Sequence, residues 1–190
     1  MLQLALDTII RPRDAADRLL QLNLSEKTLF QAALLMACLQ AILPMFGLII
    51  DRFGNTALVQ FVATYPFAMA AKYLATIYAA ALLLHRIGAS FGGKGSARQM
   101  MLLSVWYATI GVCILIPVAV VFYLNSTAGT FLMAAAALRI LFAFSLFVQK
   151  AHQFQSLFLT FVGIIVGQFL VETISTVILT GLGFPQQAGV

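Results

Sequence analysis

The stretch LFLTFVGIIVGQFLVETISTVILTGL, residues 157–182, is long enough to cross a lipid bilayer, which takes about 20 apolar residues in a helix. It carries one formal charge, Glu172, near its middle. A carboxylate in hydrocarbon is costly unless it is protonated, paired or hydrated. The fold must therefore protonate, pair or hydrate Glu172. Two other apolar stretches each carry a cation at similar depth, Lys72 and Arg139.

The composition of the whole chain agrees with a membrane protein. Of its 190 residues, 62% are hydrophobic and 9% charged, and the mean hydropathy is +1.01. Soluble domains have about 25% charged residues. The apolar runs are continuous over about 20 residues, which favours helices over barrel strands. We expect an all-α polytopic membrane protein with an amphipathic interfacial segment over residues 1–24 and a transmembrane domain over residues 25–190, with five spans at about 26–50, 56–84, 99–123, 130–148 and 157–182.

Residues 1–10 are too short to span the membrane, and charged residues recur through the rest of the first 24. Pro12 suits the first turn of a short helix. In that helix, residues 15, 16, 19 and 20 are all alanine or leucine and form one apolar face. We expect a hairpin-like pair of helices in the membrane interface, the alternative being a partly disordered tail. Charged residues interrupt the segment, so it does not resemble a cleaved signal peptide.

The basic residues outside the spans predict the orientation of the chain. Eight of them fall on the side of the N-terminus, and only Arg52 falls on the other. Cytoplasmic loops carry the excess of Lys and Arg, so we expect a cytoplasmic N-terminus and an exterior C-terminus in an inner membrane. Six of these cations are candidates for contact with lipid or with a protein partner: Arg11, Arg13, Arg18, Arg86, Lys94 and Arg98.

Within the membrane we expect a charge cluster of Lys72, Arg139, Glu172 and Gln168. Arg139 is the predicted mate of Glu172, because a guanidinium can bind a carboxylate with two hydrogen bonds and the fourth and fifth spans are neighbours in sequence. Lys72 is left with three alternatives: it shares Glu172, it meets carbonyls freed by Pro66, or it is neutral. The cluster is either a translocation path or proton-sensitive switch, or a structural ion-pair network.

Two glycines of the last span, Gly163 and Gly167, form a GxxxG pattern. This pattern predicts close packing against another helix.

No catalytic group of residues emerges from the sequence, so we expect no enzyme and no cofactor. The stretch GASFGGK, residues 88–94, has the skeleton of a phosphate-binding loop, but Gly95 stands where that loop needs Ser or Thr. We therefore expect no nucleotide. His85 and His152 have no Cys, Asp or Glu at metal-ligand spacing, which predicts interfacial side chains and no metal site. The cations lie beside membrane spans, so nucleic acid is not an expected partner either.

The stretch GGKGSARQMMLLSVWYA, residues 92–108, resembles the bacterial branch of the Yip1 domain family. Arg11 and Pro12, followed by residues 16–20, also resemble the short amphipathic lead-in of those proteins. The proline that often follows the aromatic-alanine step of the family is not beside Tyr107 and Ala108 here; the next is Pro117. The resemblance implies an integral membrane protein of five spans without enzymatic activity. Eukaryotic relatives serve vesicle traffic and bind small GTPases, a partner that we do not extend to this chain.

These observations leave two hypotheses of different class. In the first, the protein binds another membrane protein, or a second copy of itself, or organises membrane lipid through its basic loop and N-terminal segment. In the alternative, it is a small channel, carrier or lipid-moving protein that uses Lys72, Arg139 and Glu172.

Overall fold

The computed structural model describes residues 2–49 and 64–181. These residues form seven helices: α1 (Leu2–Ile10), α2 (Pro12–Leu20), α3 (Glu26–Ile49), α5 (Pro66–Ser90), α6 (Ala97–Leu124), α7 (Ser126–His152) and α8 (Leu157–Gly181). Five of them, α3, α5, α6, α7 and α8, are long and apolar enough to cross a membrane. The predicted all-helical bundle is therefore confirmed, with five candidate spans.

The second span differs most from its predicted bounds of 56–84. Helix α5 begins at Pro66, which occupies its first turn, because a proline ring fits the start of a helix and disrupts its interior. The predicted part before residue 64 lies outside the described residues. At the other end α5 continues to Ser90, so the predicted loop 85–98 is only the connection of residues 91–96. In that connection Gly92 has a φ of 80°, a conformation that suits glycine.

Side-chain caps mark the starts of α3, α6 and α7. The hydroxyl of Ser25 accepts a hydrogen bond from the backbone N–H of Thr28 at 3.1 Å and so caps α3, which begins at the predicted residue 26. Ser96 forms a reciprocal capping box with Gln99 at the start of α6. Asn125 caps α7 through the N–H of Ala128 at 3.0 Å and is the only residue between α6 and α7. The fourth span is therefore longer at both ends than the predicted 130–148.

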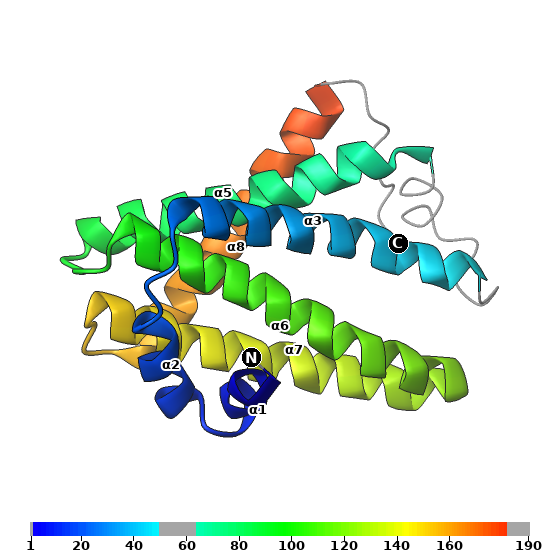
Figure 1. The fold of residues 1–190 in the computed structure, drawn as a ribbon, viewed down its shortest axis with the longest axis horizontal. Helices are drawn as coiled ribbons and strands as arrows, with labels where there is room; N and C mark the ends of the chain where they lie inside the picture. Colours follow the sequence, from blue (N-terminus) through cyan, green and yellow to red (C-terminus); the bar gives the residue numbers. More distant parts are fainter. Residues whose placement is uncertain (1, 50–63, 182–190) are drawn as a thin grey trace.

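The five long helices pack as one bundle (Figure 1). Helix α6 contacts α3, α5 and α7, and α8 packs against α5 and α7. The predicted adjacency of the last two spans is confirmed. Many large apolar side chains point away from the bundle, among them Phe67, Phe131, Phe158 and Phe169. Such exposure suits lipid as the surrounding solvent.

Helices α1 and α2 form a hairpin, here called the N-terminal hairpin, that packs on α7 (Figure 1). Ala15, Ala16 and Leu19 of α2 are fully buried, and they share the largest apolar cluster with residues of α6 and α7. Pro12 opens α2 as predicted. The apolar face of α2 is therefore covered by protein.

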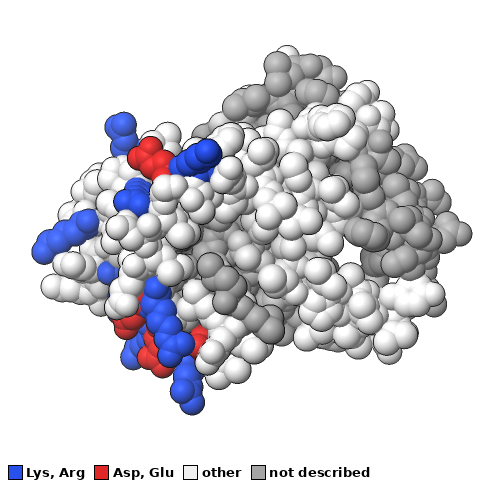
Figure 2. All heavy atoms as spheres, viewed as in Figure 1, with Lys and Arg blue, Asp and Glu red and all other residues white. Residues whose placement is uncertain are grey.

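The charged side chains on the face shown in Figure 2 gather at one end of the molecule. This end, here called the charged end, contains α2, the connection of residues 91–96 and the turn of residues 153–156. The same face is otherwise free of visible charge over its described part. Charge at one end and apolar surface along the helices are typical of a bundle inserted in a membrane.

Candidate functional site

Glu172 forms an ion pair with Lys72, which joins α8 to α5. Lys72 Nζ lies 3.5 Å from Glu172 Oε2, and the two side chains are 19% and 49% exposed. Of the three alternatives for Lys72, the structure shows the first: Lys72 lies beside Glu172, the one acid of α8. Lys72 follows Pro66 by six residues, which is about 9 Å along α5, so the pair lies toward the end of the bundle opposite the charged end.

Arg139 does not contact Glu172, and the predicted pair of these two residues is wrong. The Arg139 Nη2 group donates a hydrogen bond to the carbonyl of Ile9, and its guanidinium lies 5.7 Å from the centre of the Phe142 ring. Ile9 is in the last turn of α1, where carbonyls lack partners within the helix. Helices α7 and α8 do touch, but Arg139 occupies the face of α7 that meets the N-terminal hairpin.

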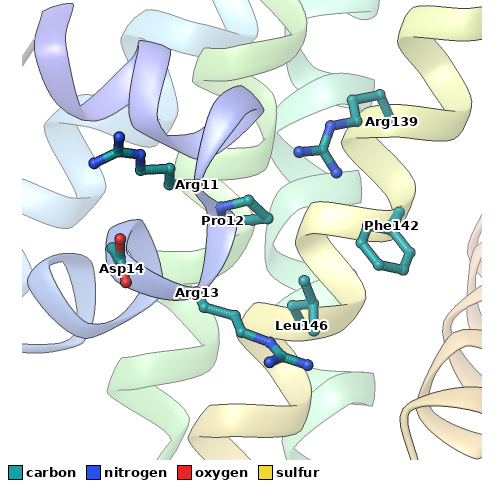
Figure 3. A pocket seen from close by; sticks show the side chains of 7 residues that line it. All are labelled: Arg11, Pro12, Arg13, Asp14, Arg139, Phe142 and Leu146. Atoms are coloured by element: carbon teal, nitrogen blue, oxygen red, sulfur yellow. The ribbon is translucent and has the colours of Figure 1, made fainter.

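A pocket of about 330 Å³ lies between the N-terminal hairpin and α7 (Figure 3). We call it the hairpin pocket; its lining residues are Arg11, Pro12, Arg13, Asp14, Arg139, Phe142 and Leu146. In Figure 3 the side chain of Arg139 extends from α7 toward Pro12, and that of Arg13 extends from α2 toward Leu146. Arg11 and Asp14 extend to the other side of the turn. One cation of the predicted intramembrane cluster therefore lies beside cations of the N-terminal segment.

Gln168, the fourth member of the predicted cluster, lines a separate cavity of about 600 Å³ between α5, α7 and α8. Gly163 and Gly167 line it as well. A Cβ added at either glycine would meet no described atom within 4 Å, so the expected close helix packing is not found on this face within the described part of the chain.

His152, expected at the membrane interface, is almost fully buried at 1% exposure. Its Nε2 lies 3.1 Å from the carbonyl of Leu84, and its Nδ1 accepts the N–H of Gly95 at 3.2 Å. A carbonyl oxygen only accepts, so Nε2 carries the proton and both bonds suit the neutral ring. The backbone carbonyl of His152 also accepts the N–H of Lys94 at 3.1 Å. This one residue fastens the connection of residues 91–96 to the end of α7.

Three glycines make room for the His152 ring. A Cβ added at Gly88, Gly93 or Gly95 would lie within 3.0 Å of a ring atom. The glycine-rich stretch, which has the skeleton of a phosphate-binding loop, was therefore the one signal of the His152 site in the sequence. A single sequence does not show which distant side chain fills the space beside a glycine.

The six cations predicted to contact lipid or a partner are all exposed. Two of them have partners within the protein. Arg18 pairs with Asp7 at 2.8 Å, and Arg98 donates through Nε to the carbonyl of Leu24 at 2.9 Å. Lys150 of α7 pairs with Asp17 and donates to the carbonyl of Arg13 at 3.3 Å. These two contacts join α2 of the N-terminal hairpin to the last turn of α7.

No three His, Cys, Asp or Glu side chains lie close enough to hold a metal ion in residues 2–49 and 64–181. The arrangement offers an ion pair between two helices, a basic pocket and a basic end.

Five long apolar helices in one bundle define an integral membrane protein of the polytopic class. The sequence model of the Yip1 domain matches residues 6–179, so the chain belongs to the Yip1 domain family. The predicted membership of the Yip1 domain family is thereby confirmed at the level of the family as a whole. No curated protein and no solved structure matches the chain.

Proposed function

We propose that this protein is a non-enzymatic Yip1-domain membrane protein that binds another membrane protein, or a second copy of itself, or organises lipid at its charged end. The observation that carries the proposal is the set of exposed cations gathered there: Arg11, Arg13, Arg18, Arg86, Lys94 and Arg98. Basic residues beside membrane spans attract the anionic lipids of the cytoplasmic leaflet. In this proposal residues 1–24 lie in the interface, with the N-terminus in the cytoplasm and the C-terminus outside.

The test measures attraction between the charged end and anionic membrane. Wild-type protein in nanodiscs of neutral lipid is mixed with anionic liposomes, and capture is followed by flotation. Replacing Arg86, Lys94 and Arg98 with Ala should weaken capture, and 1 M salt should weaken capture by the wild type, because such contacts are screened. Arg18→Ala should weaken capture less than the triple variant does, since it removes one cation and Arg18 is already paired with Asp7. Unchanged capture by the triple variant would remove the lipid role of this loop.

Protein partners are sought by purification in mild detergent. A stoichiometric partner retained by the wild type and lost from the triple variant would support the binding role. A partner retained equally by both would place the binding surface away from this loop.

The alternative class is a channel or carrier. Its support is the exposed carboxylate of Glu172 beside Lys72 at membrane depth. The separation of Arg139 from that pair argues against a channel or carrier. It leaves only two charged groups together among the described residues, whereas a translocation path needs a series of them. Flux through liposomes that falls on Glu172→Gln would favour the alternative, and absence of flux from both proteins would favour the first proposal.

A further inference from the structure

We propose that the hairpin pocket binds the phosphate of one anionic phospholipid, with Arg13 and Arg139 holding the phosphate and an acyl chain continuing along α7 away from the charged end. The proposal deepens the lipid role proposed for the charged end, because it names a ligand class and a site. It also gives a function to Arg139, a cation in the middle of a predicted span that does not contact Glu172.

The charge of the pocket favours an anion. Its lining contains three cations and one acid, a net charge of +2. Arg139 and Arg13 approach the α7 side of the pocket from two different helices, while Asp14 extends away from that side (Figure 3). Two guanidinium groups from separate elements are well suited to a phosphate, which accepts several hydrogen bonds at once.

The donors needed for a phosphate are free in the described part of the chain. A guanidinium has five N–H donors, and the contact of Arg139 with Ile9 uses one of its two terminal nitrogens. Stacking against Phe142 further orients that guanidinium. The Arg13 side chain is exposed and makes no ion pair with any residue in the ranges 2–49 and 64–181. The contacts with Ile9 and Phe142 therefore hold the Arg139 guanidinium in place, while N–H donors of Arg139 and Arg13 stay available for a ligand.

The place of the pocket suits a lipid better than a soluble phosphate. Helix α7 has 27 residues and is about 40 Å long, whereas the hydrocarbon layer is about 30 Å thick. About 10 Å of α7 therefore extends beyond the hydrocarbon, and the charged end is the end suited to water. The guanidinium of Arg139 reaches the polar turn between α1 and α2, beside Arg13.

Arg139 is 13 residues from His152, about 20 Å along α7, and Phe142 and Leu146 lie between it and the charged end. The pocket therefore extends from the level of the lipid headgroups into the hydrocarbon layer, a depth that a soluble phosphate reaches only by leaving water. An acyl chain would continue from Arg139 away from the charged end, along the exposed apolar side chains Leu138 and Phe131 of α7.

The test is native mass spectrometry of the full chain in mild detergent, with phosphatidylglycerol or phosphatidylcholine of identical acyl chains added. The wild type should retain phosphatidylglycerol more strongly than phosphatidylcholine. Arg13→Gln and Arg139→Gln should each weaken retention of phosphatidylglycerol about tenfold, since a hydrogen bond to a charged group contributes about that factor or more. Arg139→Lys should recover part of the loss, because it keeps the charge and loses the planar donors.

The matched control is Arg18→Gln, on the same helix as Arg13 but outside the pocket and paired with Asp7. It should weaken retention of phosphatidylglycerol less than Arg13→Gln does, because Arg18 does not line the pocket. Emission from Trp106, the single tryptophan, reports whether each variant keeps the hairpin packed. If Arg139→Gln fails to fold, Arg13→Gln carries the test, because the Arg13 side chain makes no ion pair with a described residue.

Several results would overturn the proposal. These are equal retention of the two lipids, unchanged retention by Arg13→Gln, and an equal loss in Arg18→Gln. Displacement of the lipid by glycerol phosphate at equal concentration would make the pocket a site for soluble phosphate instead. A protein partner lost on Arg13→Gln, without change in lipid retention, would make it a protein surface.

The outcome is separable from that of the proposed function. If the pocket variants retain lipid while the triple variant of Arg86, Lys94 and Arg98 loses liposome capture, the pocket is refuted and the charged end keeps its role. If only the pocket variants lose lipid, the hairpin pocket is supported as a lipid site and the lipid role of the loop with Arg86, Lys94 and Arg98 is refuted.

Discussion

The neutral ring of His152 has a definite place because three glycines leave space for it and two backbone groups bond it. A substitution that adds side-chain volume at one of these glycines should therefore disturb the ring. Gly88 lies in α5 directly beside the ring, whereas Gly163 lies in α8 beside open space. The two glycines therefore offer a matched pair of helical positions with opposite surroundings.

Gly88→Ala should lower the free energy of unfolding by about 1–3 kcal/mol, because the added methyl group overpacks the site of His152. Gly163→Ala should leave stability equal or higher by about 0.5–1 kcal/mol, since alanine suits a helix better than glycine. Thermal denaturation in mild detergent measures both. A Gly88→Ala protein as stable as Gly163→Ala would contradict the close approach of α5 to the ring.

Single residues also mark the limit of what the sequence predicts about the site. Charge and depth identified Lys72, Arg139 and Glu172 as unusual, and the adjacency of α7 and α8 was correct. The pairing failed because adjacency does not say which face of α7 turns toward α8. The free carbonyl of Ile9, which binds Arg139 instead, has no signature in the sequence, since every residue has a carbonyl.

At the scale of elements, the N-terminal hairpin depends on α6 and α7. Trp106 of α6 donates to the hydroxyl of Thr8 at 3.1 Å, and Arg139 of α7 bonds the end of α1. Both contacts are made through α1. Loss of either should loosen the hairpin while the long helices stay packed.

Arg139→Leu should therefore loosen α1, at a cost of about 1.5–3 kcal/mol for a hydrogen bond from a charged group. Arg18→Leu should cost less than about 1 kcal/mol, because an exposed ion pair contributes little. The measurements are limited proteolysis between α2 and α3 and the emission of Trp106. Equal protease resistance of the two variants would show that Arg139 does not hold α1.

Helix bounds were predictable where local chemistry decides them. Helix α2 begins at Pro12 and α3 begins at residue 26 as expected, because the shape of proline and the cap by Ser25 act within one turn. The end of α5 at Ser90 was not expected, since His85 and Arg86 were read as loop residues on polarity. In the fold His85 is half-buried and donates through Nδ1 to the carbonyl of Gly95 at 3.1 Å, a contact ten residues away that local patterns do not contain.

At the scale of the whole molecule, the charged end fixes the expected orientation. With Cys38 and Cys113 replaced by Ala, single cysteines are introduced as Ser90→Cys at the end of α5 and Ser126→Cys at the start of α7. In sealed cells an impermeant maleimide should label the Ser126 variant, and should label the Ser90 variant only after permeabilisation, because basic ends remain in the cytoplasm. The reverse pattern would invert the topology and place the basic loop outside.

The hydrogen bond from Arg139 to Ile9 joins residues 130 positions apart. During synthesis the N-terminal hairpin emerges before the long helices, yet its position on α7 exists only after α7 has followed. Through that interval Ala15, Ala16 and Leu19 lack the contacts with α7 that bury them in the final fold. A segment made before the long helices is thus among the last to reach its final position.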